Sequence, residues 1–292
     1  MGRKFDHLVL PVHDLDRARQ FYGSIGFTLT PLARHPFGTA NSLVQLRGNF
    51  LELLGVADPA AIPKPAAGKF SFGAFNETFL KKREGFSMLV LASKDAAADA
   101  AAFKAQGLDA YDVFNFGRDA TLPDGGKARV DFSLAFVTEP SMPDAVFFAC
   151  QQHAPQYFWR PEYQKHANGA IRIAEVVMSA RDPARYRDFF SRLMAAPVSP
   201  SAEGLSVFTT GEKVTVLNDA ALATRYPEIA RRRDDDTPRF EAYVIATSNL
   251  PSVKALLAGS GIPCRDTEKS VVISPKAAFD LAIEFTEASG ST

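Results

Sequence analysis

Two stretches of the chain, residues 7–27 (HLVLPVHDLDRARQFYGSIGF) and residues 175–195 (EVVMSARDPARYRDFFSRLMA), align with each other without a gap. The identical pairs in this register are Val9 and Val177, Asp14 and Asp182, Arg17 and Arg185, Arg19 and Arg187, and Phe21 and Phe189. A second pair of stretches, residues 86–108 and 240–262, aligns in the same way. Because both ungapped registers recur in the same chain order, they indicate an internal duplication.

Each of these repeats has the same local pattern. A run rich in leucine and β-branched residues predicts a strand, and a helix N-cap residue follows it. These N-cap residues are Asp14, Asp95, Asp182 and Asn249. A short amphipathic helix and then shorter extended stretches come next, so each unit is expected to be a βαβββ module.

The modules pair into two domains. We place them at about residues 4–56 and 86–151 in a first domain, 1–154, and at about 170–218 and 238–287 in a second domain, 168–288. Segments rich in Gly, Pro, Ala or charge separate them. The predicted fold class is α+β, with four βαβββ modules in two curved-sheet domains.

Composition limits the class of protein and of partner. The 292 residues carry 33 Lys and Arg against 33 Asp and Glu, so a net charge of zero argues against nucleic acid and anionic membranes as partners. No apolar run is long enough for a membrane helix, and a strand pattern begins at once at the N-terminus. Two cysteines are too few for a disulfide framework. We therefore expect a cytoplasmic protein with a small-molecule partner, and a homodimer is left open.

The sequence resembles the vicinal oxygen chelate superfamily, which includes glyoxalases, bleomycin-resistance proteins and extradiol dioxygenases. The resemblance lies in residues 5–10 (FDHLVL) with 14–16 (DLD), and in residues 49–54 (NFLELL). Residues 34–41 (RHPFGTAN) resemble the glyoxalase-like branch. The resemblance implies that paired modules form a half-open sheet around a divalent metal. The fold hosts isomerases, dioxygenases, epimerases and drug-sequestering proteins, so it does not fix the reaction.

The resemblance also implies where metal ligands would lie. In the superfamily they usually lie on the first and last strands of each module, as a His or Gln, Glu, His, Glu set. His7 and Glu52 match the two positions of the first module and would hold Zn, Ni, Mn or Fe. If side chains alternate strictly, His7 faces the cup of the curved sheet and Asp6 faces away from it. The alternative for His7 and Glu52 is a hydrogen-bonded pair without metal.

The second module departs from this pattern. It offers Ser87 or Met88 where a histidine is expected, and Phe148 or Cys150 where a glutamate is expected. Only half of the metal site therefore remains, unless another subunit donates a ligand. Cys150 has no adjacent base and is expected to be a buried core residue rather than a nucleophile.

In the second domain, the corresponding positions carry carboxylates and no histidine. They are Glu175, then Glu241 or Ala242, and finally Glu284. Such a set suits Mn or Mg, but the alternative is ordinary salt-bridged strand residues. The two-His-one-carboxylate triad is absent, which disfavours extradiol dioxygenase activity.

Other candidate residues lie outside the strands. His35 and Asn41 belong either to a simple turn or to a loop that binds and acts on a ligand. Trp159 and Arg160 lie in the connector, the segment of about residues 155–168 between the two domains. They either pack the connector against the first domain or form a lid in which Arg160 recognises an anion. Phenylalanine is abundant, with 24 residues against one Trp, and some of these rings, Phe148 among them, could line an apolar pocket rather than the sheet core.

Two functional hypotheses remain. The first is a glyoxalase-like enzyme of the lyase or isomerase type that acts on a carbonyl-bearing molecule, with Glu52 and His35 as catalytic residues and a metal on His7 and Glu52. The second is a metal-free binding protein like the drug-sequestering members, in which Phe-rich walls hold the ligand. The absent second-module ligands favour the second hypothesis, and the presence of His7 and Glu52 favours the first.

Overall fold

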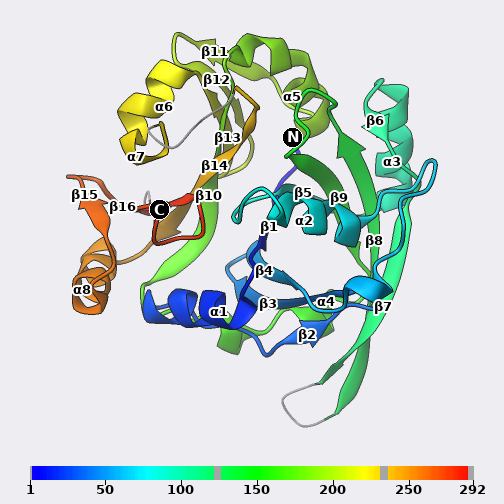
Figure 1. The fold of residues 1–292 in the computed structure, drawn as a ribbon, viewed down its shortest axis with the longest axis horizontal. Helices are drawn as coiled ribbons and strands as arrows, with labels where there is room; N and C mark the ends of the chain where they lie inside the picture. Colours follow the sequence, from blue (N-terminus) through cyan, green and yellow to red (C-terminus); the bar gives the residue numbers. More distant parts are fainter. Residues whose placement is uncertain (1, 122–125, 231–235, 289–292) are drawn as a thin grey trace.

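The computed structural model describes residues 2–121, 126–230 and 236–288, which form two curved mixed sheets with helices (Figure 1). The first sheet has the strand order β2 (Ala33–Arg34), β3 (Thr39–Gln45), β4 (Phe50–Val56), β1 (Phe5–Pro11), β5 (Met88–Ser93), β9 (Val146–Gln152), β8 (Lys127–Thr138) and β6 (Asp109–Ala110), with β7 (Phe114–Thr121) paired on β8. The second has the order β11 (Val198–Ser201), β12 (Gly204–Phe208), β13 (Lys213–Leu217), β10 (Ala170–Ser179), β14 (Arg239–Thr247), β17 (Ala282–Glu287), β16 (Ser270–Ile273) and β15 (Cys264–Asp266).

The two sheets have the same topology. In the first, β1 runs parallel to β4 and antiparallel to β5, and β5 runs parallel to β9. In the second, β10, β13, β14 and β17 repeat these relations. The duplication and the paired half-barrels expected from the sequence are thus confirmed.

The helices begin where the cap residues predict. Asp14 accepts a hydrogen bond at the start of α1 (Leu15–Ser24), and Asp95 does so for α3 (Ala96–Ala105). Asp182 caps the 3₁₀ turn η3 (Pro183–Tyr186), which leads into α5 (Arg187–Met194), and Asn249 caps α8 (Leu250–Ser260). Shorter helical segments are η1 (Pro59–Ala61), α4 (Pro155–Phe158) and η2 (Pro161–Gln164).

Two helical insertions were not predicted. Helix α2 (Phe72–Leu80) lies between the first two modules, and α6 (Asp219–Arg225) with α7 (Pro227–Ala230) lies between the last two. The last strand, β17, begins at Ala282, directly after a turn in which Phe279 and Asp280 adopt positive φ angles.

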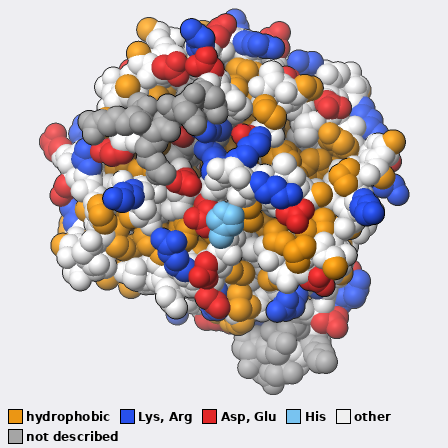
Figure 2. Space-filling model, viewed as in Figure 1, with side chains coloured by type: hydrophobic (Ala, Val, Ile, Leu, Met, Phe, Trp, Pro, Cys, Tyr) orange, Lys and Arg blue, Asp and Glu red, His pale blue; other side chains and the backbone are white. Residues whose placement is uncertain are grey.

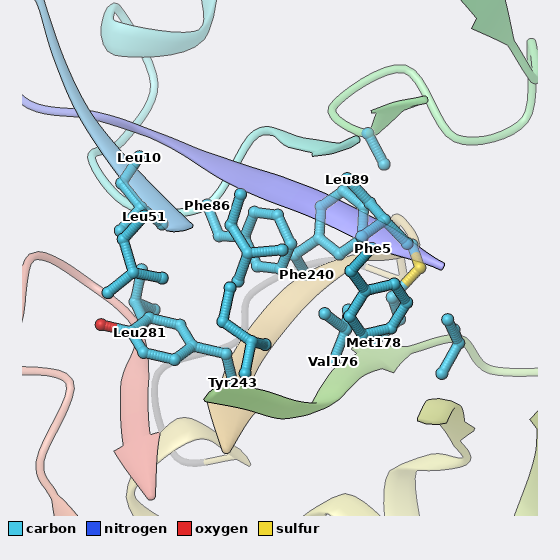
Figure 3. Packing of buried hydrophobic residues seen from close by; sticks show 14 of the residues in the cluster. Phe5, Leu10, Leu51, Phe86, Leu89, Val176, Met178, Phe240, Tyr243 and Leu281 are labelled. Carbon is cyan, nitrogen blue, oxygen red and sulfur yellow. The ribbon is translucent and has the colours of Figure 1, made fainter. Parts of the chain in front are cut away.

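The two domains pack through the sheet faces opposite to their cups. Figure 3 shows Phe5, Phe86 and Leu89 of the first domain against Val176, Met178 and Phe240 of the second. The rings of Phe86 and Phe240 stack with centroids 3.9 Å apart. Since one continuous apolar core joins the domains, the cups lie on faces that point away from each other.

The surface carries both charge signs. Figure 2 shows basic and acidic side chains mixed across one face, as the equal numbers of the two kinds suggest. Within the described residues, no helix is both long and apolar enough to cross a membrane.

Candidate functional site

The cup of the first sheet contains a small cavity of about 50 Å³ with mostly aromatic walls. The polar lining residues are His7, His35, Asn41, Glu52 and Arg118, and the apolar ones include Phe37, Phe50, Phe72, Phe116, Phe132, Phe148 and Phe158. Such a lining, apolar with a few convergent polar groups, is typical of small-molecule sites. The Phe-rich pocket proposed from composition is therefore present.

His7 lies at the floor of this cavity between two carboxylates. Its Nδ1 is 2.6 Å from Asp6 Oδ1, and its Nε2 is 3.6 Å from Glu52 Oε2, longer than a direct hydrogen bond. The ring stacks on Phe50, with centroids 4.3 Å apart. A hydrogen bond to a carboxylate fixes the orientation of the imidazole, so Nε2 is directed toward Glu52.

The expectation that Asp6 faces away from the cup is wrong. Strand β1 is irregular between Phe5 and His7 where it pairs with β5, and this bulge breaks the alternation of side chains. The Asp6 carboxylate consequently bonds His7 and also accepts a hydrogen bond from Gln152 Nε2 at 2.9 Å.

Glu52 is held from its other side by Asn41. The Asn41 Nδ2 donates to Glu52 Oε1 at 2.6 Å and lies 3.2 Å from His35 Nε2. Asn41 is only 4% exposed, yet its Oδ1 has no partner among the described residues. A buried acceptor without a partner is costly, so this atom is a candidate for a hydrogen bond from a bound ligand.

His35 positions Asn41 rather than facing the cavity with a free nitrogen. Its Nδ1 bonds Thr39 Oγ1 at 2.8 Å, and its Nε2 accepts from Asn41. The turn that presents it requires Gly38, which has a φ of +87° and packs so closely on Asp58 that a Cβ would clash. His35 and Asn41 thus share one network, and both line the cavity.

The electrostatics of this network separate the two histidines. Burial alone would lower the pKa of His7, but the Asp6 and Glu52 carboxylates hold this pKa above its usual value. Burial alone would raise the pKa of Glu52, but the interaction with His7 holds it below its usual value. Burial lowers the pKa of His35 to about 4 despite attraction from Glu52. The cavity floor therefore favours a charged His7 beside an ionised Glu52, with a neutral His35.

The strand registers identify the four positions where the superfamily places metal ligands. His7 pairs with Phe50 as Met88 pairs with Val146, so Met88 is the counterpart of His7. By the same registers, Phe148 is the counterpart of Glu52. Both Met88 and Phe148 belong to the apolar cluster of the cup.

The side chains at these four positions do not supply the donor atoms that a divalent metal ion needs. Catalytic metal sites normally have three protein ligands, whereas the cup offers His7 and Glu52 with two apolar side chains at the remaining positions. No group of three or more metal-ligating side chains occurs in the part of the chain that the structure describes. The side chains at these four positions therefore do not make a complete metal site.

In the second domain, an arginine lies between the candidate carboxylates. Arg225 donates to both oxygens of Glu175, at 2.8 and 3.0 Å, and to Glu284 at 2.9 Å. Tyr226 donates to Glu284 at 2.5 Å. The register places Ala242 at the remaining histidine position, whereas Glu241 bonds Ser179 and Arg239 at a bulge of β14. The salt-bridge interpretation of Glu175 and Glu284 thus describes the structure, and α6 and α7 fill this cup.

The connector residues have separate surroundings. Trp159 packs against Phe50 and Phe158 and does not line the cavity. Arg160 lines a second, outer cavity that adjoins the first. Cys150 is buried in the cup, and burial raises the pKa of its thiol, which agrees with a core residue.

Sequence reasoning missed two polar residues of the site. It predicts that Asp6 faces away from the cup, and it assigns no role to Arg118 on β7. The alternation of Phe114, Phe116 and Arg118 along a strand could have placed Arg118 on the cup face. Nothing local in the sequence indicates the bulge that turns Asp6.

The comparisons with known proteins identify the family. The glyoxalase-like domain family matches residues 5–194. The chain belongs to this family. A search of curated protein sequences gives no significant match.

Solved structures share the fold across the whole chain. A hypothetical protein from Staphylococcus aureus has a TM-score of 0.68 at 12% identity, covering 97% of this chain and 98% of its own. The Mn(II)-bound glyoxalase from Novosphingobium aromaticivorans has a TM-score of 0.57 at 13% identity, covering 98% and 83%. The 2,2',3-trihydroxybiphenyl 1,2-dioxygenase from Sphingomonas wittichii has a TM-score of 0.54 at 12% identity, covering 99% and 91%. At such low identities these likenesses show a shared fold and establish neither the activity nor the ligand of this chain.

Proposed function

We propose that the first domain of this glyoxalase-like protein binds a small, largely apolar carbonyl compound and catalyses proton transfer next to the carbonyl, as an isomerase or lyase. The observation that carries this proposal is the position of His7, held by Asp6 with its Nε2 3.6 Å from the Glu52 carboxylate at the floor of an aromatic cavity. An acid and a base are thereby close enough to serve adjacent atoms of one ligand.

Each side chain has a role in this scheme. A protonated His7 donates a hydrogen bond from Nε2 to the carbonyl oxygen and stabilises the negative charge that develops there. Glu52 accepts the proton from the neighbouring carbon, and Asn41 holds Glu52 in place. In an α-hydroxycarbonyl compound, Glu52 returns the proton to the former carbonyl carbon, while the hydroxyl proton moves to the former carbonyl oxygen through His7, which completes an isomerisation. In a compound with a leaving group on the next carbon, departure of that group with its bonding electrons completes an elimination. Neither route needs an oxidant.

Proton exchange provides the test. With 2-hydroxyacetophenone in D₂O as the probe, we expect the protein to exchange the hydrogens next to the carbonyl for deuterium, as followed by proton NMR. Glu52→Gln should abolish this exchange. Glu77→Gln, which alters a more exposed carboxylate on α2, should retain it. No exchange by the unchanged protein, at a probe concentration that binds, would overturn the catalytic proposal.

A second candidate is sequestration of an aromatic molecule without turnover. The apolar Met88 and Phe148 favour it, because they occupy two of the four ligand positions of the cup and extend its apolar wall. Binding of the ketone without exchange would support this candidate. The two proposals therefore share the binding step and differ in the chemistry.

A further inference from the structure

An outer cavity adjoins the aromatic one and has a different character. The two cavities share Leu43, Arg118 and Phe158, so these residues form the boundary between them. Whereas aromatic rings dominate the inner cavity, the outer one is lined by Arg34, Arg118 and Arg160.

These arginines converge from separate parts of the chain. Arg34 is on β2, Arg118 is on β7, and Arg160 precedes η2 in the connector. None of the three side chains forms a hydrogen bond or ion pair with another described residue. The acidic side chain in this lining is the exposed Asp119. Positive groups gathered without equal negative charge repel one another and attract anions.

The connector is fixed in a position that brings Arg160 to this cavity. The side chain of Gln45 donates to the Phe158 carbonyl at 2.8 Å and accepts from the Arg160 backbone N–H at 3.0 Å. Gln45 is only 2% exposed, so a buried amide holds both backbone groups. The backbone at Arg160 is therefore held in place by hydrogen bonds to Gln45 of β3, and does not belong to an unattached loop.

Exposed apolar side chains lie in the same place. Leu32 is 50% exposed and Tyr157 is 42% exposed, and both line the outer cavity. Apolar surface beside cationic groups suits a ligand that has an apolar body and an anionic end.

We infer that the outer cavity binds an anionic oxygen group, such as a carboxylate, on the molecule whose apolar part occupies the aromatic cavity. The ligand is thus an amphiphilic organic acid, oriented with its apolar end on the cavity floor and its anion among the three arginines. Guanidinium groups bind carboxylates through paired hydrogen bonds, which supplies both affinity and orientation. This inference rests on the binding step of the proposed function.

A matched pair of probes tests it. Titration calorimetry with 4-phenylbutyrate and its neutral analogue 4-phenylbutanamide should show the carboxylate binding about tenfold more tightly, a difference of about 1.4 kcal/mol. Arg34→Gln and Arg160→Gln should each weaken carboxylate binding about two- to fivefold and leave amide binding unchanged. The preference should also diminish in concentrated salt.

The control is Arg185→Gln, which removes the same charge from an exposed position on η3 of the second domain. It should alter neither affinity. Equal binding of both probes would overturn the inference and leave the proposed function intact. A carboxylate preference that persists in both outer-cavity variants, Arg34→Gln and Arg160→Gln, would also overturn it. Failure of both probes to bind would overturn the proposed binding step itself.

Discussion

Arg225 and Glu175 form a paired contact in which Nη1 donates to Oε1 at 2.8 Å and Nη2 donates to Oε2 at 3.0 Å. Glu175 is the counterpart of His7 by strand register, and the same guanidinium also reaches Glu284, the counterpart of Phe148. The second cup therefore contains a cation from its own chain between the two carboxylates. Duplication has left one cup with a cavity and the other filled by α6 and α7.

Removing the guanidinium should destabilise the protein. Arg225→Ala leaves Glu175 and Glu284, both mostly buried, without their main partner, so we expect a loss of about 2–4 kcal/mol in the free energy of unfolding. Arg225→Lys keeps the charge but loses the paired geometry, so its cost should be smaller. Urea unfolding followed by circular dichroism measures both. Arg181→Ala, at an exposed ion pair, is the control and should change stability by less than about 0.5 kcal/mol.

The same contact predicts a dependence of stability on pH. Burial alone would raise the pKa of Glu175, but Arg225 and Lys213 hold it below its usual value. A carboxyl whose pKa is lowered by folding stabilises the protein above its unfolded pKa, about 4.3, and this contribution is lost as the pH falls through the folded value. Unfolding free energies measured from pH 7 down to pH 3 should therefore fall more steeply in the unchanged protein than in Glu175→Gln. Parallel curves would contradict the assignment.

Much of the fold is encoded in local patterns that sequence reasoning can use. Ungapped repeats and the capping residues Asp14, Asp95, Asp182 and Asn249 predict the modules, because strand periodicity and helix capping depend on neighbouring residues. The insertion at α6 and α7 has a local signal as well, since Leu222, Tyr226 and Ile229 follow helical spacing. The packing of this helical segment into the second cup depends on tertiary contacts, so the spacing of residues along the chain does not predict it.

In the candidate site, too, the sequence predicts residues from local patterns but does not predict how tertiary contacts arrange them. His7, Glu52, His35 and Asn41 were identified from the sequence, and the structure joins them in one network. Asp6 was misassigned because a bulge, which depends on pairing with β5, changes the direction of its side chain. The outer cavity could not be predicted because its three arginines lie far apart in the sequence and meet only through the fold of β2, β7 and the connector.

The metal content of the purified protein should reflect the fact that the first cup offers only two donor side chains, His7 and Glu52. Protein purified without chelator is expected to carry well below one equivalent of Zn, Ni, Mn or Fe, because His7 and Glu52 lack a third protein ligand. Elemental analysis of the unchanged protein, His7→Ala and Glu52→Ala provides the measurement. Near-stoichiometric metal that disappears in both variants would contradict this prediction and would show that His7 and Glu52 bind a metal ion in the first cup.

Interdomain packing should be a large source of stability. Phe86 and Phe240 are fully buried and stack across the shared core, so Phe86→Ala should lower the free energy of unfolding by about 3–5 kcal/mol. Phe208→Ala removes a ring that is 59% exposed and should cost little. Urea unfolding again measures both, and a small effect of Phe86→Ala would mean that the domains are stable without this contact.

Restoring the two absent ligands tests the register argument directly. In the double variant Met88→His and Phe148→Glu, the new side chains should face His7 and Glu52 across β1, β5 and β9, completing a four-donor set. Without metal, this variant should be less stable by more than about 2 kcal/mol, because a carboxylate replaces a buried ring.

Divalent metal should reverse that loss. Saturation at about one hundred times the dissociation constant adds about 2.7 kcal/mol, which thermal unfolding with and without Mn or Zn would detect. The matched control is Ala242→His in the second cup, where Arg225 already lies between Glu175 and Glu284 and should exclude the ion. If the double variant bound no metal, His7 and Glu52 would not be arranged as ligands, and their pairing would have to be explained by the proton-transfer network alone.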